Sequence, residues 1–220
     1  MTVTTGRTLE DGRPVPGTGF EVEEGSQLAE LLAERTGPLT SHPTRPVWGA
    51  TLEGPEDTIR TLSVLGAGYD GPPEHYHEQS LERFEVLSGE PVFEIDGTDH
   101  RAQAGETVTI ETGERHTFRV EEGLSYMIAD VHSPGRLRQV FPTLGGLAHD
   151  DGVDIRNPLQ QAVIADRLTG NTVFTEPDPR VGRPLTSLLS PLARLGGYRA
   201  AYAKYSQPAF WRAHVEQPDL

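Results

Sequence analysis

The strongest constraint on the fold is a series of short segments between residues 58 and 132 in which apolar and polar side chains alternate. The alternation is clearest in 58–65 and in 106–112, and turns containing glycine separate the segments. In an extended strand, every second side chain lies on the same side. The other segments of the series are 84–87, 91–95, 117–120 and 125–131. Short strands joined by turns predict an antiparallel sandwich or barrel.

The composition agrees with a turn-rich β protein that has a hydrophobic core. The 220 residues include 24 glycines and 18 prolines, which is a heavy load for a helical bundle. The apolar content is too high for a disordered chain. The chain contains no cysteine, which rules out disulfides, thiol nucleophiles and cysteine-ligated zinc and leaves the redox compartment undetermined. A cytoplasmic location is the default expectation.

The charge excludes one class of partner. The formal net charge is −14, and no basic stripe offsets it, so binding to the phosphate backbone of a nucleic acid is not expected. No apolar run approaches the length of a membrane-spanning helix, and residues 1–7 contain no apolar signal core. We therefore expect a small-molecule substrate or ligand, with no nucleic acid and no membrane as partner.

Three zones that differ in composition and residue spacing predict the domain organisation. Residues 1–45 are polar, are broken by Gly and Pro, and contain a short amphipathic helix at 26–35, with Ser26 as N-cap. Residues 46–132 form the β unit. Residues 133–220 carry leucines at helical spacing near 135–147, 159–168 and 185–195, punctuated by prolines. We expect an N-terminal arm, a β-barrel and a C-terminal helical extension whose leucines belong to the core. The three prolines are Pro158, Pro184 and Pro191.

Three histidines and a glutamate could converge on one metal ion. His75 and His77 are two residues apart, so a strand directs both imidazoles to the same side. Glu82 begins the next strand, and His116 stands at the head of another. Such a nitrogen and oxygen donor set suits Fe, Mn, Ni, Zn, Cu or Co. The alternative is that His75 and His77 are two ordinary strand histidines that bind no metal.

Neighbouring carboxylates compete with Glu82 for the ligand role. Strand parity from Glu82 sends Phe84 and Val86 inward and Glu85 outward, whereas Glu78 lies in the turn after His77. The remaining histidines have no partner at ligand spacing and are expected at the surface or in hydrogen bonds, with His132 nearest the barrel edge. These histidines are His42, His100, His132, His149 and His214. Phosphate-binding loops and a Gly-x-Ser-x-Gly elbow are absent from the sequence.

The quartet resembles the two motifs of the cupin superfamily. The first motif is matched by His75-x-His77, four residues, Glu82, six residues and Gly89. The second is matched in spacing by Gly105, Gly113 and His116. The departures from the two motifs are Tyr69 in place of a glycine, Glu111 in place of a proline and Val120 in place of an asparagine. They fall on turn and scaffold positions and not on the ligand positions.

The resemblance implies a fold, a cofactor and a range of activities. The fold would be all-β, a small antiparallel cupin barrel of jelly-roll type. His75, His77, Glu82 and His116 would bind a divalent transition metal, and Glu82 could also act as a catalytic base. A metal-dependent dioxygenase, and so an oxidoreductase, is the leading interpretation. The alternatives are a non-catalytic binding or regulatory module and a Lewis-acid isomerase or lyase.

The resemblance also implies a homodimer, because small cupins commonly dimerise. The N-terminal arm, the leucine-bearing helices and an aromatic tail supply material for an interface. The tail runs from Gly196 to Trp211 and contains Tyr198, Tyr202, Tyr205, Phe210 and Trp211. In the alternative interpretation, the arm and the helices cap the barrel of a monomer.

Overall fold

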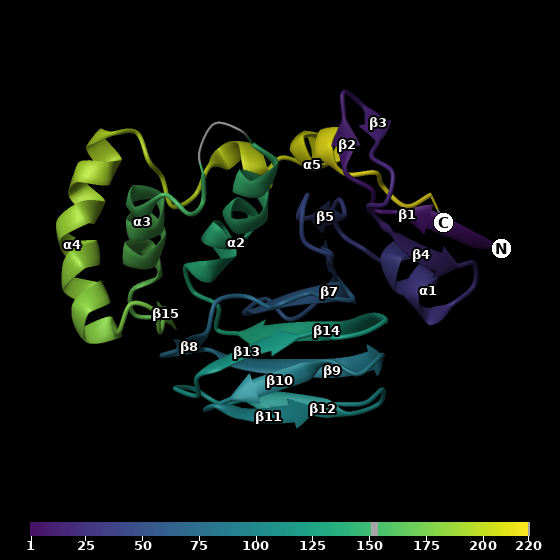
Figure 1. Ribbon diagram of the computed structural model, residues 1–220, viewed down its shortest axis with the longest axis horizontal. Helices are drawn as coiled ribbons and strands as arrows, with labels where there is room; N and C mark the ends of the chain where they lie inside the picture. The colour runs from purple at the N-terminus through teal and green to yellow at the C-terminus, as the bar shows by residue number, and fades with distance from the viewer. Residues whose placement is uncertain (151–153, 220) are drawn as a thin grey trace.

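Two antiparallel β-sheets that face each other make up the lower part of the molecule in Figure 1. The computed structural model describes residues 1–150 and 154–219. One sheet has the order β12 (Thr107–Ile110), β9 (Leu81–Ser88), β14 (Leu124–His132), β7 (Thr58–Gly66), β6 (Val47–Thr51) and β5 (Thr40–Ser41). The other has the order β11 (Thr98–Arg101), β10 (Val92–Ile95), β13 (His116–Arg119), β8 (His75–His77) and β15 (Thr172–Phe174).

The side chains between the two sheets follow the predicted alternation. In β9, Glu82, Phe84 and Val86 are buried and the residues between them are only half-buried. The ring of Phe84 lies 5.2 Å from that of Phe93 and 5.5 Å from that of Phe118, both on the opposite sheet. Rings at these separations pack tightly and exclude water from the space between the sheets.

The expected closed barrel is wrong, since the described strands form two separate sheets. The six-stranded sheet ends at β12 and β5, and the five-stranded sheet ends at β11 and β15. The chain crosses from one sheet to the other at several turns, among them residues 89–91, 102–106 and 111–115. Such crossings join the sheets by turns instead of by a continuous hydrogen-bonded ladder.

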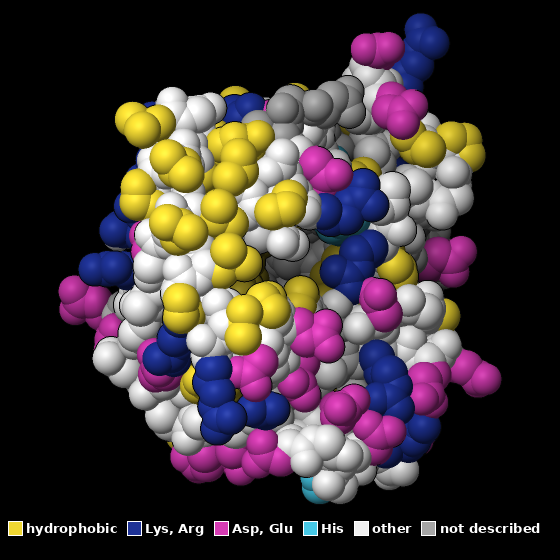
Figure 2. All heavy atoms as spheres, turned by 60° about the vertical axis from the view of Figure 1, so that its left-hand side comes forward, with side chains coloured by type: hydrophobic (Ala, Val, Ile, Leu, Met, Phe, Trp, Pro, Cys, Tyr) yellow, Lys and Arg dark blue, Asp and Glu magenta, His cyan; other side chains and the backbone are white. Residues whose placement is uncertain are grey.

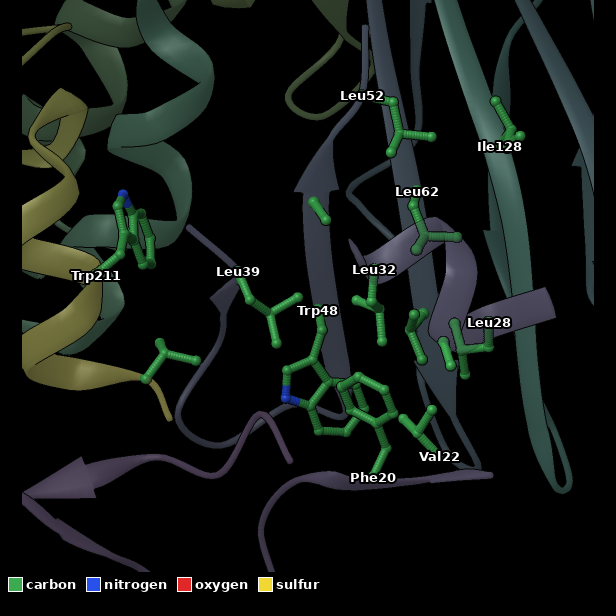
Figure 3. Packing of buried hydrophobic residues seen from close by; sticks show 14 residues of the cluster. Phe20, Val22, Leu28, Leu32, Leu39, Trp48, Leu52, Leu62, Ile128 and Trp211 are labelled. Atoms are coloured by element: carbon green, nitrogen blue, oxygen red, sulfur yellow. The ribbon is translucent and has the colours of Figure 1, made fainter. Parts of the chain in front are cut away.

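The N-terminal residues pack on the outer face of the six-stranded sheet. They form two small antiparallel pairs and a helix, namely β1 (Thr2–Thr5) with β4 (Phe20–Glu23), β2 (Leu9–Glu10) with β3 (Arg13–Pro14), and α1 (Gln27–Ala33). The prediction of this helix and its cap is confirmed, because Ser26 Oγ accepts from the Ala29 amide at 3.2 Å. Leu28 and Leu32 of α1 face Trp48 and Leu62 of the sheet (Figure 3).

The residues after β14 are mostly helical, which is consistent with the expected C-terminal helical extension. The elements are α2 (Leu137–Gly146), the 3₁₀ turn η1 (Leu147–His149), α3 (Pro158–Leu168), α4 (Pro179–Leu195), the 3₁₀ turn η2 (Ala203–Ser206) and α5 (Pro208–His214). Pro158 starts α3 as predicted, whereas Pro184 and Pro191 lie inside α4 instead of punctuating it. Both prolines are exposed, so water can bond the carbonyls that they leave without a helical donor. The domain limits after residues 45 and 132 stay predictions.

The leucines of α4 correct a second expectation, namely that leucines in this region belong to the core. Leu137 and Leu168 are buried as expected, but Leu188 is 68% exposed and Leu195 is 86% exposed. The other face of α4 packs against α3 and contains the buried Ser190 and Ala193. These small residues let the two helices approach closely, so α4 leaves its larger apolar side chains in solvent.

The C-terminal residues return to the N-terminal ones. The guanidinium of Arg7 makes two hydrogen bonds of 2.6 and 2.7 Å to the carboxylate of Glu216, and the amide of Gln217 donates to the Leu39 carbonyl at 3.1 Å. The two ends of the chain accordingly lie close together in Figure 1. Among the helices of the described residues, none is both long enough and apolar enough to cross a membrane.

Candidate metal centre

Both sheets contribute to the four residues that the sequence singles out. His75 and His77 lie on β8, and His116 begins the neighbouring strand β13, where it pairs with His75. Glu82 comes from β9 of the opposite sheet and reaches across the space between the sheets. One ligand atom from each of the four residues lies within 4.8 Å of the others. The structure therefore brings the whole predicted quartet together at a single point.

The carboxylate of Glu82 lies between two imidazoles. Its Oε1 is 3.0 Å from His77 Nε2, and its Oε2 is 3.1 Å from His116 Nε2. The rings of His75 and His116 are 4.3 Å apart. Glu82, His77 and His116 are all buried. Buried charged groups at such distances need a shared partner or a compensating charge.

The outer nitrogens of two histidines are fixed by backbone carbonyls. His75 Nδ1 lies 2.8 Å from the Pro73 carbonyl oxygen, and His116 Nδ1 lies 3.1 Å from that of Glu114. A carbonyl can only accept, so each Nδ1 carries a hydrogen and donates it. In the neutral ring, the lone pair is then on Nε2, which faces the centre. Histidines that bind metals are commonly held in this way by their other nitrogen.

A chain of polar side chains fixes the third histidine in the same state. His77 Nδ1 lies 3.0 Å from Thr172 Oγ1, and that hydroxyl donates to Asn171 Oδ1 at 2.9 Å. Since the threonine hydrogen is used in this bond, Thr172 accepts from His77 Nδ1. The Asn171 amide in turn donates to Ser80 Oγ at 2.9 Å, and Ser80 donates to the Ser133 carbonyl. All three imidazoles thus present Nε2 to Glu82.

Thr172 and Asn171 are functional residues that sequence reasoning missed. Thr172 begins β15, which pairs with β8 in the register Thr172 to His77 and Phe174 to His75. The strand has only three residues and lies between two helices, so neither alternation nor helical spacing distinguishes it. The Thr-Val-Phe triplet at 172–174 is β-prone, which is the only local signal.

The residues fit a metal ion. His77 Nε2 is buried and has no hydrogen-bond partner among the described residues, although Glu82 Oε1 lies 3.0 Å away. Burial alone would raise the pKa of Glu82, but the hydrogen bond from His116 and the proximity of His77 outweigh it and hold that pKa below its ordinary value. A carboxylate that stays ionised beside an unpartnered nitrogen lone pair is the donor arrangement that a divalent cation needs.

Two of the imidazoles, those of His75 and His116, differ in their electrostatics. Burial, with a further contribution from His116, lowers the pKa of His75 to about 4, so this ring is neutral near pH 7. Burial also opposes the charged form of His116, but the hydrogen bond and charge of Glu82 are stronger and raise its pKa above the ordinary value. The charged form is therefore favoured at His116 and disfavoured at His75, and a metal ion at His116 Nε2 would compete with a proton there.

The competing carboxylates and the other histidines lie away from this centre. Glu78 accepts from Arg183 Nη2 at 2.5 Å, and Glu85 lies 3.5 Å from Arg83. His132 lies 3.2 Å from the Thr58 hydroxyl, so this histidine forms a hydrogen bond at the end of its strand. Within the described residues, none of the five other histidines joins the quartet. These five are His42, His100, His132, His149 and His214.

A cleft of about 1470 Å³ opens onto the quartet. His75, His77 and Glu82 lie in its wall, and Tyr69, Phe84 and Phe118 lie beside them. Residues of α2, α3 and α4 also line this cleft. A polar cluster in the wall of a largely apolar cleft is typical of small-molecule sites.

Comparison with known proteins identifies the domain. The family profile described as "Cupin domain" matches residues 61–129. A search of curated proteins gave no match. Among solved structures, a predicted oxalate decarboxylase from Thermotoga maritima is 24% identical over 46% of this chain and 94% of its own, with a TM-score of 0.40.

Two further solved structures show the same limited similarity. A putative sugar phosphate isomerase from Acidithiobacillus ferrooxidans is 16% identical over 47% of this chain and 72% of its own, with a TM-score of 0.41. The Streptomyces protein PAC13, in a complex with uridine, is 16% identical over 46% of this chain and 78% of its own, with a TM-score of 0.37. The family match lies on the strands that position the quartet, so residues 61–129 match a cupin domain.

Proposed function

We propose that the protein is a metal-dependent enzyme that converts a small organic molecule, with dioxygenase chemistry as the leading reaction type. The observation that supports the proposal most directly is the set of three Nε2 atoms and one carboxylate at the wall of a largely apolar cleft. A site that only stores a metal ion needs no such space for an organic molecule. The cleft, at about 1470 Å³, is large enough for a substrate.

His75, His77, Glu82 and His116 would hold the metal. When bound, an ion such as Fe, Mn, Ni, Zn, Cu or Co would supply Lewis acidity and, where redox-active, a route for electrons to dioxygen. Phe84 and Phe118, which pack 5.5 Å apart, would exclude water beside it. Tyr69 would add a third apolar surface against a substrate ring or chain.

Glu82 is the residue that we assign to proton transfer. Its Oε2 lies 3.1 Å from His116 Nε2, so proton exchange between these two groups needs no large movement. A substrate hydroxyl that approaches from the cleft could lose its proton to this carboxylate, and His116 would stabilise the protonated pair. Its neighbours in the cleft wall are the imidazoles of His75 and His77 and the apolar rings of Phe84 and Phe118, so Glu82 is the carboxylate at this point of the wall.

The test begins with metal content. The purified protein is stripped with a chelator and reloaded with each of the six metals in turn, and bound metal is measured per chain. We expect one ion per chain, and we expect His77→Ala to lose most of it while its circular dichroism stays unchanged. Full occupancy in His77→Ala would overturn the assignment of the site.

Oxygen uptake then separates the reaction types. Each loaded form is given a panel of enolic and phenolic compounds, and oxygen consumption is followed with an electrode. Uptake that depends on one metal and disappears in Glu82→Gln supports a dioxygenase. Conversion of a substrate without oxygen uptake would instead support a Lewis-acid isomerase or lyase. One bound ion without turnover across the panel would contradict the proposal and support a binding module.

A further inference from the structure

The outer face of α4 is an apolar surface that nothing in the described structure covers. It is made of seven residues, which we call the α4 apolar face: Val181, Pro184, Leu185, Leu188, Pro191, Leu192 and Leu195. The Val and Leu side chains among them are between 46% and 86% exposed. Figure 2 shows hydrophobic side chains gathered on this part of the surface. Exposed apolar patches of this kind mark interaction sites.

The spacing of the face is symmetric about Leu188. Apolar residues stand three, four and seven positions before Leu188 and again three, four and seven positions after it. If a second α4 lies antiparallel with Leu188 opposite Leu188, Val181 meets the partner's Leu195. In the same pairing, Pro184 meets the partner's Leu192 and Leu185 meets the partner's Pro191. A two-fold interface requires this kind of self-complementarity.

The charges around α4 favour a second copy of the same chain. The protein has a net charge of −14, yet α4 contains no acidic residue. Two of its arginines are neutralised within the chain, since Arg183 pairs with Glu78 and Arg194 with Asp166, each at 2.5 Å. Two copies that approach through α4 therefore avoid the acidic surfaces that would repel them elsewhere.

We propose that α4 is a self-association surface, on which a second copy of this chain packs as an antiparallel helix pair centred on Leu188. The inference is independent of the proposed enzymatic function. A helix of 17 residues is about 25 Å long, so the pair alone is smaller than a standard protein interface. The dimer is therefore expected to dissociate on dilution.

The first test is the mass in solution. Sedimentation or light scattering over a wide concentration range should show a mass that rises from 24.0 kDa toward twice that value. Leu188→Glu should stay monomeric at every concentration, because it places a charge at the two-fold axis. Its side chain is 68% exposed, so folding should be unaffected. The matched control is Ser187→Glu, which adds the same charge on the flank of the helix and should still dimerise.

The second test uses the absence of native cysteine to determine the orientation. With a short bismaleimide, Leu188→Cys should crosslink to its own copy. Val181→Cys alone should not, because seven residues on each side of the centre separate the two copies by about 21 Å. A mixture of Val181→Cys and Leu195→Cys should crosslink. Crosslinking of Val181→Cys to itself would indicate a parallel pair and contradict the proposal.

Two outcomes would overturn the assignment of this surface. One is a monomer at all concentrations that binds phosphatidylcholine and phosphatidylglycerol vesicles through Leu188, which would make α4 a membrane-surface helix. The other is a dimer that persists in Leu188→Glu, which would place the interface elsewhere on the molecule.

Discussion

At the residue scale, the candidate site depends on which nitrogen of each imidazole carries its hydrogen. Pro73 and Glu114 supply carbonyls to two histidines, and Thr172 supplies an accepting hydroxyl to the third. Each contact leaves Nε2 as the atom that faces Glu82. The strand positions of the histidines alone would leave this choice open, so the outer contacts prepare the quartet for a metal ion.

Glu82 and Glu85 provide a test of the strand register. Glu82→Gln should lower metal affinity at least about tenfold and abolish turnover, because it removes the only carboxylate of the quartet. Glu85→Gln is the matched control, since Glu85 lies beside Arg83 outside the cluster, and it should change little. Chelator competition gives the affinities. The opposite ranking would show that the register of β9 is off by one or more residues.

Thr172 is expected to act as a positioning residue for His77. Thr172→Val removes the hydroxyl that accepts from His77 Nδ1, so the ring can turn and the metal affinity should fall about 10–100-fold. Thr172→Ser keeps the hydroxyl and should restore the affinity, which a purely structural role in β15 would not predict. Metal competition measures both variants, and equal affinity in wild type and Thr172→Val would refute the role.

At the element scale, segments from distant parts of the chain meet around the sheets. β15 comes from the region after α3 and forms the edge next to β8. The 3₁₀ turn η1 touches β5 at the edge of the other sheet, where His149 Nε2 donates to the Ser41 carbonyl at 2.9 Å. These contacts connect the helical region to both sheets and help to hold the cleft between them.

The contact between His149 of η1 and Ser41 predicts that the stability of the folded protein depends on pH. Burial lowers the pKa of His149 to about 4, the bond to Ser41 opposes this shift, and the nearby His214 and His42 add to it. The folded protein thus binds this proton less readily than the unfolded chain, whose histidine pKa is near 6.5. The stability from His149 is present above about pH 6.5 and is lost as the pH falls toward 4.

The measurement is urea unfolding at pH 7 and pH 4.5. His149→Gln should lose less unfolding free energy between these two pH values than the wild type does. His100→Gln serves as the control, since His100 is exposed on β11, and it should lose as much as the wild type. An unchanged slope in His149→Gln would show that other groups account for the acid sensitivity.

At the scale of the whole molecule, the aromatic C-terminal tail is part of the core. Tyr205 and Trp211 are almost fully buried, and the Trp211 indole donates to the Tyr205 carbonyl at 2.8 Å. Trp211 packs in the cluster that contains Trp48 and Leu39, so it connects the tail to the sheet. The expectation that these aromatics are not left in solvent is confirmed for these two residues.

Trp211→Ala should therefore lower the free energy of unfolding by about 3–5 kcal/mol, because it opens a large cavity and removes a buried hydrogen bond. Deletion of residues 197–220 should destabilise the protein further. Denaturant unfolding of the full-length variant measures the first effect, with Arg212→Ala as an exposed neighbour that should change little. A midpoint equal to that of the wild type in Trp211→Ala would contradict this role.

The sequence by itself determined the features that depend on local periodicity. Alternation located β7 and β12, and strand parity placed Phe84 and Val86 inward with Glu82. The spacing of His75 and His77 put both imidazoles on one side of a strand. The N-cap of α1 also followed from residues only three apart. Each of these features is written in a short segment, because side-chain direction follows from the backbone period.

Only the tertiary structure decided which distant segments meet. Strand alternation does not tell a closed barrel from two facing sheets, since both bury every second side chain. Thr172 reaches His77 from 95 residues away, a pairing that no local period contains. Leucines at helical spacing likewise indicate an apolar face without saying what covers it. On α4, the contact with α3 uses the small residues and leaves Leu188 in solvent.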